Sequence, residues 1–132
     1  MPDSASGLSA MKDYKEASLP LDIEHLADVS GGDWEFECEL LDEYFTTAST
    51  GLQSLSKAVE EANSDEAHRL AHSLKGSSRS IGAWPMGDVC EQFDIAARAG
   101  DLSEAGPMLE AIRARFEELE RFVRAKWNNK AA

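Results

Sequence analysis

Four stretches of this chain repeat apolar residues at alternating steps of three and four, the spacing of amphipathic helices. From about Asp33 to Ala62 the repeat consists of Leu41, Phe45, Ala48, Leu52, Leu55 and Val59. The three later repeats consist of Ala67, Leu70, Leu74, Ser77 and Ile81; of Met86, Val89, Phe93 and Ala96 or Ala97; and of Leu109, Ile112, Phe116, Leu119, Val123 and Trp127. Since no alternating strand pattern competes with these repeats, the sequence predicts an all-α fold.

Helix start and stop signals leave only very short turns between the four stretches. Asn63, followed by Glu66 three residues later, is a typical helix start, and Gly82 ends that helix. Pro85 lies near the first turn of the third long helix, and Gly100 closes it. Because consecutive helices joined by such turns run antiparallel, we expect an up-down-up-down four-helix bundle.

The two ends of the chain are expected to lie outside the bundle proper. Residues 1–18 are rich in small and polar residues and are assigned to a flexible or weakly helical segment. After Pro20, a few apolar residues before Gly31-Gly32 predict a short capping helix: Leu21, Ile23 and Leu26. The bundle is therefore assigned to residues 19–128, and residues 129–132 to a C-terminal tail.

Charge and hydropathy exclude several classes of function. The chain of 132 residues carries 25 acidic and 13 basic side chains, a formal charge of −12 that repels nucleic acid and anionic lipid. It has neither a long apolar run nor the basic start and apolar centre of a signal peptide, so a cytoplasmic location is expected. Cys38 and Cys90 fall inside predicted helices and are expected to be free thiols.

The segment Ala71-His-Ser-Leu-Lys-Gly-Ser-Ser78 carries the clearest functional pattern. His72 lies roughly opposite the centre of its helix's apolar stripe, so its ring is expected to be exposed. An exposed imidazole is largely neutral near neutral pH, and a ring nitrogen with a free lone pair can attack an electrophilic phosphorus. His72 is therefore a candidate phosphoryl acceptor.

Two neighbours of His72 suit this chemistry. Lys75 lies one helical turn away, where its ammonium can offset part of the charge of a phosphorylated histidine. Gly76 lies beside the histidine in a helix interior, where glycine costs about 1 kcal/mol relative to alanine. This cost is understandable if the absent side chain gives clearance to the backbone of a partner protein.

Further polar residues share the face of His72. His68 lies four residues earlier, and the pair is a possible set of two zinc ligands, although no glutamate follows His68 and a third ligand is not evident. The favoured interpretation places His68 and Ser73 on a docking surface for a partner. Arg79 lies seven residues after His72 and forms, with Lys75, a positive island that favours an oriented encounter. The glycines near this segment lack the closing Gly-Lys-Ser/Thr of a nucleotide loop.

The run from Ala71 to Ala83 resembles the phosphorylation motif of histidine-containing phosphotransfer (HPt) domains. The looser match spans residues 20 to 126 and includes Val89-Cys90, Phe93-Asp94, Ala97-Arg98 and Gly100-Asp101-Leu102. Ser73 replaces a frequent threonine, and Phe93-Asp94 replaces the usual Leu-Glu. The resemblance implies His72 as phospho-acceptor, Lys75 as the group that stabilises phosphoryl charge, and Gly76 as the source of steric clearance.

The resemblance also implies the partners. They are response regulator receiver domains and a hybrid or upstream histidine kinase. Mg²⁺ would come through the receiver, so that no cofactor of its own is expected. No ATP-dependent kinase activity is expected either. A monomer is expected, with no nucleic acid or membrane partner. Two alternatives stay open: the phospho-acceptor domain of a chemotaxis-type histidine kinase, and a helical adaptor that binds receivers without carrying phosphate. A zinc-binding bundle is a third interpretation.

Overall fold

The structure is a computed structural model that describes residues 19–131, and this part of the chain is helical without strands. Its five helices are α2 (Ile23–Ser30), α3 (Trp34–Glu60), α4 (Ser64–Ser80), α5 (Trp84–Arg98) and α6 (Ala105–Ala131). The all-α prediction is confirmed. The segment predicted for residues 1–18 lies outside the described residues, and α6 continues beyond residue 128, where the predicted bundle ended.

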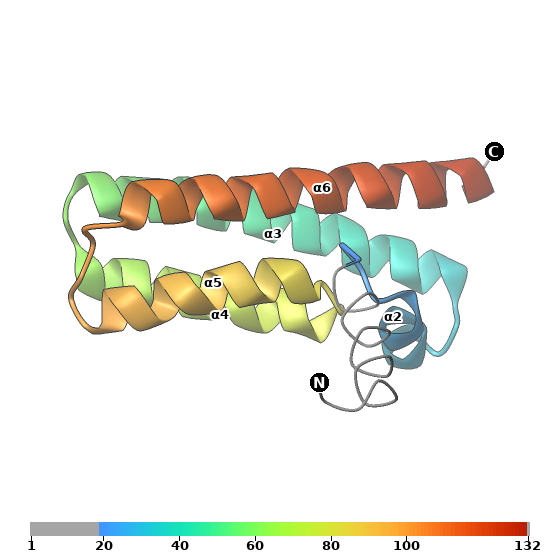
Figure 1. Cartoon of the computed structure of the whole chain (residues 1–132). Coiled ribbons are helices and arrows are strands. Elements are labelled where there is room, and N and C mark those ends of the chain that lie inside the picture. Colours follow the sequence, from blue (N-terminus) through green and yellow to red (C-terminus); the bar gives the residue numbers. More distant parts are fainter. Residues whose placement is uncertain (1–18, 132) are drawn as a thin grey trace, which may run out of the picture.

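The four long helices form the predicted up-down-up-down bundle (Figure 1). The two longest, α3 and α6, lie side by side and extend past the end of the α4–α5 pair, and the short helix α2 lies at that end. The turns between the helices are short, and the predicted start and stop signals lie at these turns. At the start of α4, for example, the Asn63 side chain accepts a hydrogen bond from the backbone N–H of Glu66 at 3.1 Å.

The core lies between the apolar stripes of the four long helices and extends to the capping helix α2. Its largest fully buried side chains are Leu21, Leu26, Leu55, Met86, Phe93, Ile112 and Leu119. On α4 the predicted stripe is displaced by one position at two places, because Ala71 and Ser78 are buried where Leu70 and Ser77 were expected. Ser78 tolerates full burial because its hydroxyl is hydrogen-bonded to the hydroxyl of Tyr44 on α3 at 2.7 Å.

The predicted capping helix, α2, is attached to the turn between α4 and α5. The Asp22 carboxylate accepts from the backbone N–H of His25 at 3.0 Å and from the indole N–H of Trp84 at 2.9 Å. The backbone N–H of Asp22 donates to the carbonyl of Gly82 at 2.9 Å. Gly82 has φ of +87°, and a Cβ there would lie 3.1 Å from the Asp22 carbonyl oxygen, so glycine is required for both reasons.

Two further sequence expectations concern the thiols and the membrane. Cys90 is buried and Cys38 is half-buried, and both are free. Burial raises the pKa of the Cys90 thiol to about 12.

Within residues 19–131, no helix has both the length and the apolar character that crossing a bilayer requires.

Candidate functional site

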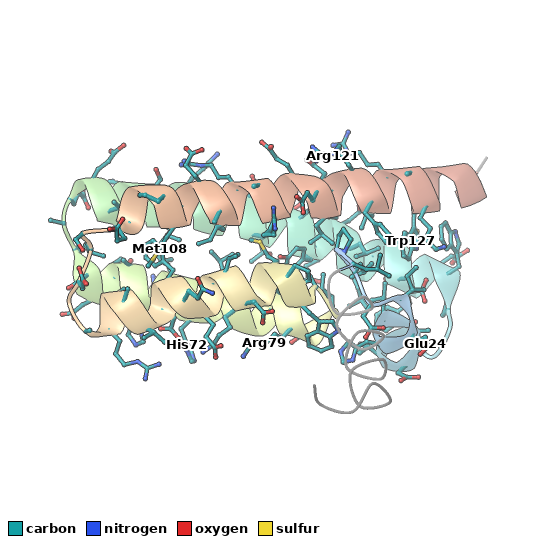
Figure 2. All side chains as sticks on the ribbon, in the orientation of Figure 1. Glu24, His72, Arg79, Met108, Arg121 and Trp127 are labelled. Atoms are coloured by element: carbon teal, nitrogen blue, oxygen red, sulfur yellow. The ribbon has the colours of Figure 1, made fainter. Side chains whose placement is uncertain are left out.

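His72 lies on α4, on the side of the α4–α5 pair that faces away from α6 (Figure 2). Its side chain is 63% exposed, as the position opposite the buried stripe predicted. One turn further along, Gly76 is also exposed, and a Cβ added there would meet nothing within 4 Å. The packing of the chain itself therefore does not require glycine at this position, which leaves open space beside the histidine.

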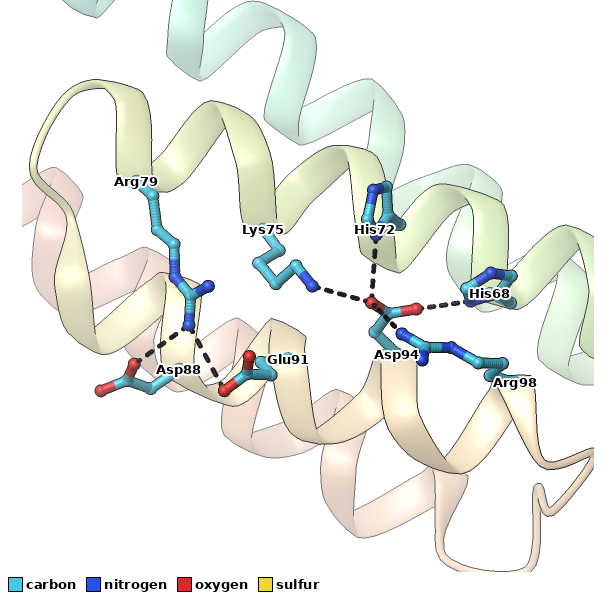
Figure 3. A network of polar contacts seen from close by, with 8 residues as sticks. All are labelled: His68, His72, Lys75, Arg79, Asp88, Glu91, Asp94 and Arg98. Atoms are coloured by element: carbon cyan, nitrogen blue, oxygen red, sulfur yellow. Dashed lines mark hydrogen bonds and ion pairs between the residues drawn. The ribbon is translucent and has the colours of Figure 1, made fainter.

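The centre of the site is a carboxylate on the neighbouring helix, Asp94 of α5 (Figure 3). Its side chain is 0% exposed and is surrounded by basic groups. Oδ2 lies 3.2 Å from Nδ1 of His72 and 3.0 Å from Nζ of Lys75, and Oδ1 contacts Nδ1 of His68. The guanidinium of Arg98, one turn along α5, lies 3.6 Å from Oδ2. One buried carboxylate therefore lies against four basic side chains: His68, His72, Lys75 and Arg98.

The ionisation of Asp94 decides which nitrogen of His72 is free. Burial raises the pKa of Asp94, but hydrogen bonds from Lys75, His72 and His68 outweigh burial and bring this pKa to about 2. The carboxylate is therefore ionised at neutral pH and can only accept hydrogen bonds. Nδ1 of His72 must then carry the proton, and in the neutral ring the lone pair lies on Nε2.

Lys75 lies one turn from His72 and reaches across to α5. Its ammonium donates to Asp94, and its side chain is only 16% exposed. An ammonium has three donors, so this bond leaves two for other acceptors. The lysine thus neutralises the buried carboxylate and still lies one turn from the ring that would carry a phosphoryl group.

Arg79 is placed differently from Lys75. Its guanidinium lies 3.4 Å from Glu91 and 3.7 Å from Asp88, both on α5 (Figure 3). The side chain passes over Gly87, where a Cβ would come within 2.8 Å of the Arg79 Cγ. Carboxylates of α5 therefore lie against both cations of the expected positive island, and the part of this island in docking stays a prediction.

The remaining predicted site residues divide into two groups. Ser73 is exposed beside His72 and Gly76, as a docking surface requires. His68 is 35% exposed, and its Nδ1 is directed at Asp94. Because the Nδ1 atoms of His68 and His72 meet the same carboxylate, their Nε2 atoms point away from it (Figure 3). Within residues 19–131, no cluster of three or more His, Cys, Asp or Glu side chains is arranged to hold a metal ion.

Two residues of this cluster, Asp94 and Arg98, were not predicted as site residues. The signal for Asp94 was its position in the buried stripe of α5, between Cys90 and Ala97. A carboxylate at a core position needs compensating donors, and the nearest helix offered His68, His72 and Lys75. The sequence marks Asp94 only through its departure from the usual Leu-Glu, because nothing in one sequence says which residues of two helices face each other.

Comparison with known proteins found a matching family model and similar chains. Residues 39–122 match the family model described as Hpt domain. The phosphorelay intermediate protein rdeA of Dictyostelium discoideum is 29% identical over 98 residues, which are 74% of this chain and 39% of that protein. The multistep phosphorelay regulator 1 of Schizosaccharomyces pombe is 37% identical over 59 residues, 45% of this chain and 20% of that protein. The chain thus spans less than half the length of these two relatives.

The fold also has a counterpart of known structure. The crystal structure of histidine-containing phosphotransfer protein B from Pseudomonas aeruginosa PAO1 superposes with a TM-score of 0.79 at 24% identity. The match covers 85% of this chain and 97% of that one. At this identity the likeness shows a common fold, and the chemistry of the site rests on the residues described above.

Proposed function

Because the chain belongs to the Hpt domain family, we propose that it acts as a phosphorelay intermediate whose phospho-acceptor is His72. His72 takes a phosphoryl group from the aspartyl phosphate of one receiver domain and passes it to the aspartate of another. The observation that carries the proposal is an exposed imidazole whose Nδ1 is held by the buried, ionised Asp94. The names of the two phosphorelay relatives support the same assignment.

The hydrogen bond to Asp94 lets the reaction proceed without moving a proton. The lone pair of Nε2 attacks phosphorus, the N–P bond forms, and the P–O bond to the receiver's aspartate breaks, so that aspartate leaves as a carboxylate. The ring keeps its proton on Nδ1 and becomes positively charged, and the negative Asp94 at 3.2 Å stabilises that charge. In the reverse direction the electron pair of the N–P bond returns to Nε2, and neutral imidazole leaves.

Lys75 and Gly76 assist this step from one turn away. A phosphoryl group on Nε2 brings close to two negative charges, and the free donors of the Lys75 ammonium can neutralise part of them. Because Gly76 leaves open space beside the ring, the receiver's backbone can approach closely enough to align its aspartate with Nε2. Positioning and neutralisation of charge account for most of the catalysis of phosphoryl transfer.

The surface around His72 offers further contacts to a receiver domain. Ser73 is exposed beside the acceptor, and Ile95, directly after Asp94, is a large apolar side chain that is 57% exposed. Mg²⁺ would be supplied by the receiver, next to its own aspartate. The partners in this proposal are two receiver domains and the histidine kinase that charges the first of them.

The test is transfer of labelled phosphate. A receiver domain from the same cell is charged with labelled acetyl phosphate and mixed with the wild type, with His72→Gln and with His25→Gln. His25→Gln is the matched control, because His25 Nε2 donates to the carbonyl of Ser80 at 3.1 Å, and the glutamine amide can replace that bond. We expect acid-labile, alkali-stable label on the wild type and on His25→Gln, and none on His72→Gln.

A chase then separates a relay from its alternatives. An uncharged second receiver should remove the label from His72, and the label should appear on that receiver. Equal labelling of the wild type and His72→Gln would refute His72 as the acceptor. Binding of receivers without any labelled histidine would instead favour the adaptor, and labelling only by the ATP-binding domain of a kinase would favour the phospho-acceptor domain of such a kinase.

A further inference from the structure

The two oxygens of Asp94 serve different groups. Oδ2 faces His72 and Lys75, whereas Oδ1 contacts His68 (Figure 3). His68 lies one turn before His72 on the same helix, and the two ring centroids are 6.0 Å apart. Because Oδ1 and Oδ2 belong to one rigid, planar group, whatever fixes the direction of Oδ1 also fixes the direction of Oδ2.

His68 is not itself built as a phospho-acceptor. His72 is followed by Lys75 at the third position and by Gly76 at the fourth. The corresponding positions after His68 hold the buried Ala71 and His72 itself. His68 therefore has no cation at the position that would neutralise a phosphoryl group and no cleared space beside it. Its Nδ1 faces the ionised Asp94 and so carries a proton, as argued for His72.

Removing the His68 ring would leave Oδ1 of a fully buried carboxylate without its ion-pair partner. A buried anion does not tolerate an unsatisfied oxygen well, so the carboxylate would turn toward the cations that remain. Arg98, 3.6 Å from Oδ2 and attached to α5 itself, and Lys75 are the available cations. Each such rotation takes Oδ2 out of line with Nδ1 of His72.

We propose that His68 is a positioning residue, which holds the Asp94 carboxylate aimed at Nδ1 of His72 and thereby keeps Nε2 of His72 free to attack phosphorus. This inference rests on the proposed function and extends it to a residue that does not touch the phosphoryl group. It differs from the docking role expected from the sequence, because it assigns His68 to the interior of the site.

Two substitutions separate positioning from other roles. His68→Ala removes the donor, whereas His68→Asn places an amide N–H close to where the imidazole Nδ1–H was. We expect His68→Ala to slow phosphoryl transfer from a charged receiver about tenfold, which is about 1.4 kcal/mol of activation free energy, and His68→Asn to stay within about threefold of the wild type. Affinity for the activated receiver should be unchanged in both variants.

A second measurement does not depend on any receiver. Nitrogen NMR of the free protein reports which ring nitrogen of His72 carries the proton. We expect the Nδ1–H tautomer in the wild type and in His68→Asn, and a mixture of tautomers in His68→Ala. If the wild type shows this tautomer but accepts no phosphate from any receiver, the proposed function fails, while the tautomer comparison still tests the role of His68.

Three outcomes would overturn the proposal. The first is an unchanged His72 tautomer and transfer rate in a folded His68→Ala variant. The second is weaker receiver binding in both variants with an unchanged tautomer, which would make His68 a docking contact. The third is label that persists on His72→Gln and disappears on adding His68→Ala, which would make His68 an acceptor.

Discussion

Replacing Asp94 with asparagine removes the buried charge that the site is built around while nearly preserving the shape of the side chain. In the folded protein the pKa of Asp94 is about 2, against an ordinary value of 3.8. A difference of nearly two units corresponds to about 2 kcal/mol of folding free energy at neutral pH. Asp94→Asn should therefore lower the free energy of unfolding by about 2 kcal/mol at pH 7.

The pH dependence of this loss follows from the direction of the shift. Because folding lowers the pKa of Asp94, the stabilisation is fully present above about pH 4 and is lost as the pH falls through about 2. The stability gap between wild type and variant should thus shrink to roughly half its size by about pH 3. Urea unfolding followed by circular dichroism measures this gap at each pH, and comparing the two proteins cancels the titration of the other carboxylates.

The control is Asp88→Asn on the same helix. Asp88 is exposed and lies 3.7 Å from Arg79, so its replacement should change stability little at any pH. The phosphoryl transfer rate of Asp94→Asn should fall about 10- to 100-fold, because the positively charged ring loses its charged hydrogen-bond partner. A variant as stable as the wild type at pH 7, or a gap that is the same at pH 3 and pH 7, would refute this account of Asp94.

Three predictions test the bundle that positions the site. Gly82→Ala should destabilise the fold by about 1–3 kcal/mol in urea unfolding, because of its positive φ and the close Asp22 carbonyl, whereas Gly106→Ala meets no atom and should not. Tyr44→Phe should lower the free energy of unfolding by about 1 kcal/mol. The double variant Tyr44→Phe/Ser78→Ala should lose less stability than the sum of the two single variants, which a double-mutant cycle measures. With a pKa of about 12 and a buried side chain, the Cys90 thiol should react with a thiol reagent at pH 8 only when the chain unfolds; fast labelling of the native protein would contradict its burial.

The helices and the exposed acceptor were predictable because they depend on local spacing. The step of three and four residues located each long helix, and the same periodicity placed His72 on the solvent side of α4. The stripe of α4 was misplaced at two positions because Ala71 and Ser78 are small, and the hydroxyl that permits the burial of Ser78 comes from Tyr44, 34 residues away. Local spacing carries no information about such a partner.

The interior of the site was not predictable for a related reason. The contacts of Asp94 with His68, His72 and Lys75 depend on the register between two antiparallel helices, which the sequence does not specify. The same register pairs Arg79 with Glu91, a contact that the sequence did not predict. What the sequence did contain was an acidic residue at helical spacing between Cys90 and Ala97, and an acidic residue at a buried position indicates a buried polar network.

The most direct test of the central claim is to find which ring nitrogen of His72 carries the phosphoryl group. Proton–phosphorus NMR of the phosphorylated protein distinguishes the two, because Nε2 lies between two carbons that bear protons and Nδ1 lies beside only one. We predict phosphorus coupling to both ring protons of His72, as the bond from Nδ1 to Asp94 requires. Coupling to a single ring proton, or a phosphorus signal from a residue other than His72, would contradict the account.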